Sequence, residues 1–177
     1  VIRPLDVKDQ LCAEIDNPED LKVVSEKLAE VENRTVYMSF SADMLHSGHI
    51  SIIRKAARLG RLTIGVLSDE AVISYKRYPL LPFAEWKALF ENIRGVSRVV
   101  EQKTLSYKEN LERIKPDFVV HGDDWVTGFQ KPVREEVLAV LAEYGGKLVE
   151  FPYSSDEKYK SLERRARADL SLPDMRR

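Results

Sequence analysis

Two of the three histidines in this chain, His46 and His49, lie close together in the run Asp43-Met44-Leu45-His46-Ser47-Gly48-His49. The run separates an apolar segment typical of a strand from a segment with the apolar periodicity of a helix. Both imidazoles are therefore expected at a helix start, where unpaired backbone N–H groups and the positive end of the helix dipole attract anions. Two imidazoles facing the same point favour a phosphate chain.

The third histidine opens a second polar run, His121-Gly122-Asp123-Asp124-Trp125, directly after a strand-like segment over 117–120. Polar groups at the ends of two parallel strands indicate one shared pocket. Two other interpretations of these polar residues stay open. The three histidines and an aspartate could form a metal site, and Asp123 and Asp124 could simply cap and solvate a loop.

Composition limits the class of protein. The chain has 177 residues, 44% of them apolar and 32% charged, which suits one compact domain with appendages. Its net charge of −1 removes the bulk electrostatic case for nucleic acid, so any phosphate site must be local. The only cysteine, Cys12, excludes an intrachain disulfide and is expected to be inert. With neither a signal pattern nor a bilayer-length apolar run, we expect a cytoplasmic protein.

The polar runs must be positioned by strands that alternate with helices. Such alternation predicts right-handed βαβ units and an α/β, Rossmann-like three-layer domain with a five-stranded parallel sheet. The predicted strands are 35–40, 62–67, 97–100, 117–120 and 147–151, and the predicted helices are 48–59, 82–94, 107–114 and 132–144.

Both ends of the chain are read as appendages. Asn17, Pro18 and the acids that follow are a strong helix start, so residues 1–34 are predicted to be a helical extension or linker. The α/β domain is assigned to 35–153, and 154–177 to a basic tail or a linker to a following domain, with a helix over 156–170. Because the chain begins with valine, we expect it to be a piece of a longer polypeptide.

The polar motifs together resemble the cytidylyltransferase branch of the His-x-Gly-His nucleotidyltransferases. The matches are the 46–49 signature, Leu67-Ser68-Asp69-Glu70, Lys76, Glu91-Asn92-Ile93-Arg94 and Gly122-Asp123-Asp124-Trp125, in the family's order. Within the branch, the runs 41–43, 74–77, 121–125 and 172–177 are most similar to cytidylyltransferase modules fused to phosphoenolpyruvate mutases in phosphonate biosynthesis.

The resemblance implies CTP-dependent transfer of a cytidylyl group to a small phosphonate or phosphate, such as 2-hydroxyethylphosphonate, with release of pyrophosphate. It implies CTP with Mg²⁺, a homodimer, and a fused mutase domain as partners, with neither nucleic acid nor membrane. The implied catalytic residues are His46, His49 and Lys76, without a protein-bound metal. The implied nucleotide-binding residues are Phe40, Ser41, Asp43, Gly48, Gly122, Asp123, Asp124 and Trp125.

Three positions depart from the family's pattern. Trp86 stands where the family usually has an arginine, although the apolar stripe Phe83, Trp86, Phe90 and Ile93 makes it a core residue. The family's Ile-Ser-Ser-Thr run is replaced by residues 157–160, and an arginine before it by Tyr153. Lys76 could also belong to a plain charged loop. The alternative function is therefore a degenerate nucleotide-binding or scaffolding module without turnover.

Overall fold

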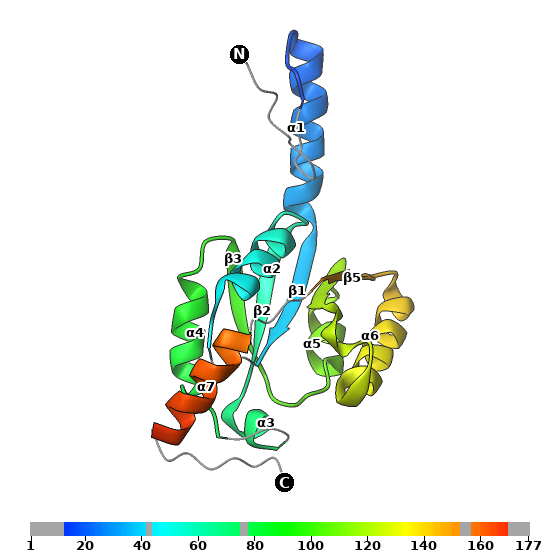
Figure 1. Cartoon of the computed structure of the whole chain (residues 1–177). Helices are drawn as coiled ribbons and strands as arrows, with labels where there is room; N and C mark the ends of the chain where they lie inside the picture. The colour runs from blue at the N-terminus through cyan, green and yellow to red at the C-terminus, as the bar shows by residue number, and fades with distance from the viewer. Residues whose placement is uncertain (1–12, 42–43, 75–77, 153–156, 170–177) are drawn as a thin grey trace, which may run out of the picture.

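The computed structural model describes residues 13–41, 44–74, 78–152 and 157–169. Its centre is a five-stranded sheet in the order β3-β2-β1-β4-β5, in which every neighbouring pair is parallel (Figure 1). The predicted parallel sheet is therefore confirmed. The strands are β1 Thr35–Phe40, β2 Arg61–Leu67, β3 Val96–Gln102, β4 Phe118–Gly122 and β5 Lys147–Phe151.

Helices cover both faces of this sheet. Ile53 of α2 and Phe90 of α4 pack against one face, whereas Leu111 of α5 and Leu141 of α6 pack against the other. Each of these side chains is at most 2% exposed, so the domain has two apolar layers with the sheet between them. The helices are α1 Pro18–Asn33, α2 Ser47–Ala57, α3 Asp69–Ile73, α4 Phe83–Glu91, α5 Lys108–Ile114, α6 Lys131–Tyr144 and α7 Glu157–Asp169, with short 3₁₀ turns η1 Asp123–Trp125 and η2 Gly128–Gln130.

Hydrogen bonds join the start of the central strand β1 to the residue that precedes β4. The Asp117 carboxylate accepts from the backbone N–H of Thr35 at 2.7 Å and from the Thr35 hydroxyl at 2.9 Å. These bonds, the backbone one foremost, hold the pKa of Asp117 below its usual range. They set the register in which Val36 of β1 lies opposite Phe118 of β4.

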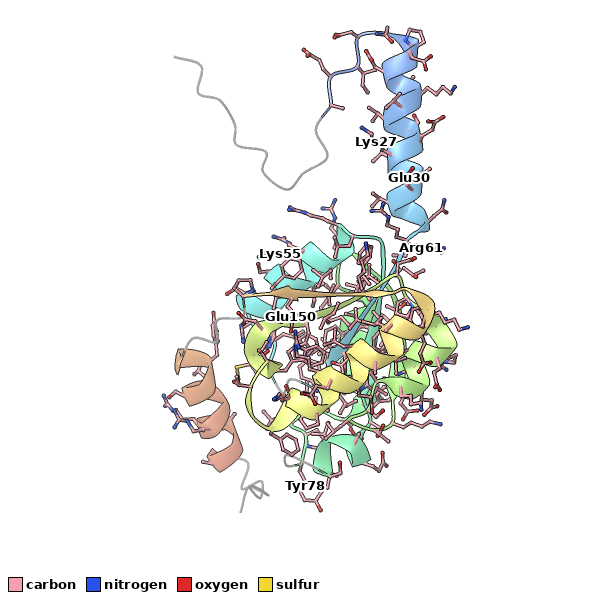
Figure 2. The ribbon with its side chains drawn as sticks, turned by 90° about the vertical axis from the view of Figure 1, so that its right-hand side faces the viewer. Lys27, Glu30, Lys55, Arg61, Tyr78 and Glu150 are labelled. Carbon is pink, nitrogen blue, oxygen red and sulfur yellow. The ribbon has the colours of Figure 1, made fainter. Side chains whose placement is uncertain are left out.

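The helix α1 leads into β1 from outside the domain. The Asn17 side chain accepts from the backbone N–H groups of Glu19 and Asp20, as the predicted helix start requires. Figure 2 shows α1 projecting away from the folded body, with Lys27 and Glu30 far from the sheet. Within the described residues, no side chain of α1 is buried. The predicted helical extension is thus present.

The elements differ from the expected ones in detail. The predicted fourth strand ends at Val120, but β4 continues to Gly122, so His121 lies within the strand and pairs with Glu150 of β5. The short helix α3 was not predicted, because five residues are too few to show a helical periodicity. Its Ser68 cap, which accepts from the backbone N–H of Ala71, is the local cause of that turn.

Along the described part of the chain, no helix combines the length and the apolarity needed to cross a membrane.

A buried polar network joins strands β1 and β3 to helix α5. The Tyr37 hydroxyl donates to the side-chain oxygen of Gln102 at 2.7 Å and accepts from the Asn110 amide at 2.9 Å. Burial raises the pKa of Tyr37 well above its ordinary value, so the phenol stays protonated. The phenol reaches across β2 at Gly65, where an added Cβ would meet its oxygen at 1.8 Å.

We expect Gly65→Ala to lower the free energy of unfolding by about 1–3 kcal/mol, because the new methyl group must displace a satisfied buried hydroxyl. Urea denaturation followed by circular dichroism measures this. The control Glu143→Ala, on the exposed face of α6, should change stability by no more than about 0.5 kcal/mol. Equal stability of both variants would contradict the assigned position of Tyr37.

Candidate active site

The His-x-Gly-His run forms the beginning of α2. His46 is the N-cap, with an extended backbone, and its Nδ1 accepts from the backbone N–H of Gly48 at 3.1 Å. The predicted helix start is therefore confirmed, and one of its N–H groups is satisfied by the imidazole itself. Because Nδ1 is an acceptor here, the proton of the neutral ring is on Nε2.

Aromatic rings pack around this histidine pair. The centroids of His46 and His49 are 3.8 Å apart with the rings tilted by 36°. Phe40, at the end of β1, packs edge-on against His49 at 4.9 Å and against Phe90 of α4 at 4.6 Å. The Phe40 side chain is 5% exposed, so it belongs to the core that supports the pair. This packing fixes the relation between the end of β1 and the start of α2.

His121 lies at the carboxyl end of β4. Its ring stacks on Trp125 with centroids 3.8 Å apart and planes within 7°. Its Nδ1 lies 2.8 Å from the Gly122 carbonyl oxygen and therefore carries the proton of the neutral ring. Burial lowers the pKa of His121 although Gly122, Asp124 and Glu150 oppose the shift. The imidazole is neutral near pH 7, and its Nε2 is an acceptor.

The Trp125 side chain is held in place by the ion pair of Glu150 and Arg134. Glu150 of β5 accepts from the Trp125 indole N–H at 2.6 Å and from two guanidinium nitrogens of Arg134 at 2.8 Å each. The hydrogen bond to Arg134, with that to Trp125, keeps the pKa of Glu150 low, and the pair raises the pKa of Arg134. Sequence analysis missed both charged residues, because the three partners share no motif.

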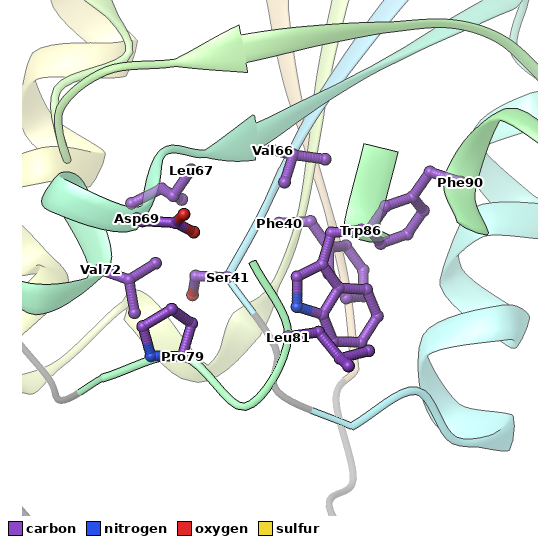
Figure 3. Close-up of a pocket in the computed structure, with 10 residues that line it drawn as sticks. All are labelled: Phe40, Ser41, Val66, Leu67, Asp69, Val72, Pro79, Leu81, Trp86 and Phe90. Carbon is purple, nitrogen blue, oxygen red and sulfur yellow. The ribbon is translucent and has the colours of Figure 1, made fainter. Parts of the chain in front are cut away.

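The described residues line two cavities near the carboxyl ends of the strands. The first is a narrow hollow whose volume of about 280 Å³ includes space open to solvent, and Figure 3 shows Phe40, Trp86 and Phe90 on one side of it and Ser41 and Asp69 on the other. Trp86 is 6% exposed and packs on Phe90, which confirms its prediction as a core residue. The second cavity has a volume of about 390 Å³, part of it open to solvent, and is lined by Ser39, Ser41, Leu67, Gln102, Leu105, Tyr107, His121, Trp125, Phe129, Gln130 and Val133.

The motif residue Asp69 has a structural partner at the first cavity. Its carboxylate accepts from the backbone N–H of Phe83 at 2.7 Å, the first residue of α4. An acid at that position also complements the helix dipole. Asp69 therefore joins the end of β2 to the start of α4, and Ser41 reaches both cavities from the end of β1.

The remaining predicted site residues divide into two groups. Gly48 lies in the first turn of α2, Gly122 ends β4, and Asp123 and Asp124 open η1. The Asp124 side chain is half exposed, with a carboxylate oxygen 3.7 Å from Nδ1 of His121. Asp43 and Lys76 lie outside the described residues.

The histidines show no metal-ligand cluster in the described ranges. Among 13–41, 44–74, 78–152 and 157–169, no three His, Cys, Asp or Glu side chains gather as metal ligands would. What the structure brings to one edge of the sheet is the imidazole pair of β1–α2 and the stacked imidazole of β4.

A parallel sheet in this strand order, with a histidine-capped helix after its central strand, is a Rossmann-like α/β domain whose candidate site lies where the strand order reverses. Over residues 41–166 the chain matches the family described as cytidylyltransferase-like. The chain belongs to that family. A solved structure titled as the lipopolysaccharide core biosynthesis protein from Thermoplasma volcanium shares the fold, with a TM-score of 0.59 and 22% identity over 69% of this chain and 98% of that one.

Curated relatives point the same way. Over 50% of this chain, the sequence is 33% identical to an ethanolamine-phosphate cytidylyltransferase of Arabidopsis thaliana. Over 47% of this chain, it is 33% identical to a glycerol-3-phosphate cytidylyltransferase of Staphylococcus aureus. It is 28% identical to a bifunctional protein HldE of Desulfatibacillum aliphaticivorans over 78%. The alignments span 23%, 64% and 28% of those three proteins, in that order.

The buried His121 makes a pH prediction with a definite sign. Because its pKa is lower in the folded chain than in the unfolded one, the unfolded state binds more protons, and stability falls as pH drops below the unfolded value of about 6.5. We expect the free energy of unfolding to decrease less between about pH 7 and pH 5 in the His121→Gln variant than in the original chain. Urea titrations at several pH values test this, and identical pH slopes for both proteins would contradict it.

Proposed function

We propose that this domain transfers the cytidylyl group of CTP to a small phosphonate, such as 2-hydroxyethylphosphonate, or to a phosphate, and releases pyrophosphate. The observation that carries the proposal is the pair His46 and His49 at the N-terminus of α2, at the carboxyl end of the central strand. That place combines helix N–H groups, the helix dipole and two imidazoles. Membership of the cytidylyltransferase-like family supports the same reaction class.

The reaction needs positioning more than proton transfer. An oxygen of the acceptor attacks the α-phosphorus of CTP, and pyrophosphate leaves in line. A phosphonate or phosphate oxygen is already ionised near pH 7, so the attack needs no general base, and catalysis rests on orientation and charge stabilisation. Because Nδ1 of His46 accepts from Gly48, its Nε2–H is the group that donates to a phosphate oxygen. Lys76 is proposed to assist the departure of pyrophosphate.

The metal in this proposal comes with the nucleotide. Mg²⁺ is held largely by phosphate oxygens and water and needs few protein ligands. Asp43, Asp123 and Asp124 remain proposed contacts of the nucleotide.

The second cavity is proposed to hold the non-phosphate end of the acceptor. It lies at the ends of β1, β3 and β4, and its lining combines apolar and aromatic side chains with uncharged polar residues, among them Ser39, Ser41 and His121. The lining residues given above include no Asp, Glu, Lys or Arg, so nothing in that described wall compensates a charged tail. A hydroxylated, uncharged tail is the better match.

The wider context of the domain is part of the proposal. We propose that it works as a homodimer, and that it is the cytidylyltransferase module of a multidomain phosphonate enzyme with a phosphoenolpyruvate mutase. The supporting observation is the motif pattern of the sequence. Light scattering of the purified chain measures the first part, and sequencing of the full gene the second.

One observation favours a second function. Trp86 fills the core where the resembling family carries a nucleotide-binding arginine. This loss of a cation favours a module that binds nucleotide without turnover. Pyrophosphate release on mixing the chain with CTP and a panel of phosphonates and phosphates, followed by phosphorus NMR of the products, separates the two functions.

We expect His46→Asn to reduce turnover about tenfold to several hundredfold, because a charge-assisted contact of about 1.5–3 kcal/mol is lost. Asparagine is a good N-cap, so α2 keeps its start and the loss reports the imidazole. Coupled pyrophosphate release measures it, and thermal unfolding checks the cap. Unchanged turnover together with unchanged CTP affinity would contradict the role.

We expect Ser39→Asp to shift acceptor preference toward ethanolamine phosphate relative to 2-hydroxyethylphosphonate by about tenfold or more, because a carboxylate in this wall attracts an ammonium group. Ser39→Asn is the matched uncharged control. The ratio of kcat/KM for the two acceptors is the measurement. A shift of the same size in the asparagine variant would show that bulk rather than charge sets the preference.

A further inference from the structure

The helix α7 brings an aromatic ring onto the histidine pair. Tyr159 stacks on His46 with ring centroids 4.5 Å apart and planes within 9°. The ring of His46 also contacts the ring of His49, with centroids 3.8 Å apart. In Figures 1 and 2, α7 lies at the end of the domain away from α1, the end where the strands finish. A residue from the last helix is therefore part of the surroundings of the first histidine.

We propose that Tyr159 is a positioning residue that holds the imidazole of His46 in its phosphate-binding orientation. This inference rests on the proposed function, because it assigns the orientation to the same site. The hydrogen bond from Gly48 to Nδ1 is one contact on a ring that can still tilt about it. A near-parallel aromatic ring adds a second contact on the ring face, and together the two restrict the plane of His46.

The stacking geometry indicates support of the ring. Tyr159 covers a face of the imidazole, whereas the Nε2–H points outward from the ring edge within the ring plane. A phosphate oxygen approaches along that edge, so the stack and the hydrogen bond are compatible.

Tyr159 lies within the segment 157–160, which stands where the family's pattern has the hydroxyl-rich Ile-Ser-Ser-Thr run. In this chain the segment thus reaches the site by packing on a histidine, a contact between residues far apart in sequence. Through this contact α7 helps to organise the start of α2.

The test compares Tyr159→Phe and Tyr159→Leu in the full chain by proton–carbon NMR of the imidazoles. With three histidines in the sequence, single substitutions assign each signal. We expect the His46 Cε1–H signal to stay in place in the phenylalanine variant and to move downfield in the leucine variant, which lacks ring-current shielding. Leu162→Ala, at a partly exposed position of the same helix, is the control and should leave the signal unmoved.

Function is measured on the same proteins. We expect Tyr159→Leu to lower kcat about tenfold with little change in the KM of the acceptor, and Tyr159→Phe to remain within about twofold of the original chain. A titration with CTP, followed through the His46 signal, should show weaker binding in the leucine variant alone.

Two results would overturn the inference. One is an identical His46 signal in the leucine and phenylalanine variants, since the stack would then be absent in solution. The other is faster turnover or tighter CTP binding in the leucine variant, since Tyr159 would then cover the phosphate site. Failure of the proposed function shows differently, as absence of pyrophosphate release by the original chain, and leaves the NMR comparison and the CTP titration to decide the role of Tyr159.

Discussion

The reversal of strand order at β1 is the constraint on which the site depends. From β1 the sheet continues through β2 and β3 on one side and through β4 and β5 on the other, so the connecting helices pack on opposite faces. The segments that leave β1 and β4 therefore diverge at the carboxyl edge and leave a crevice between them. His46 and His121 follow or end those two strands, which places their imidazoles at the edge where an α/β sheet binds its ligands.

At that edge of the sheet the two histidine regions are built for different tasks. His121 is stacked on a tryptophan that an ion pair holds in place, and burial keeps its ring neutral. His46 caps a helix and faces the positive end of its dipole, where an anion is stabilised. The neutral ring suits a wall that selects shape and hydrogen bonding, and the helix cap suits a site that holds phosphate.

Aromatic packing links this chemistry to the core. Phe40 contacts both His49 and Phe90, so the apolar layer under α4 directly supports the histidine pair. Trp86 belongs to the same layer and lines the first cavity. The core that folds the domain therefore also determines where the imidazoles point, and a substitution in it acts on stability and on the site together.

The sequence by itself determined the fold class, the alternation of strands with the longer helices along the chain, and the start of α2, because these follow from local periodicity and from capping chemistry. It also identified Trp86 as core from an apolar stripe. Only the tertiary structure decided that β4 continues through His121, because that extension depends on pairing with β5. The same holds for the Glu150–Arg134 anchor of Trp125 and for the stack of Tyr159 on His46, since each joins residues from different elements. Contacts of this kind are set by how the layers pack, and no local pattern encodes them.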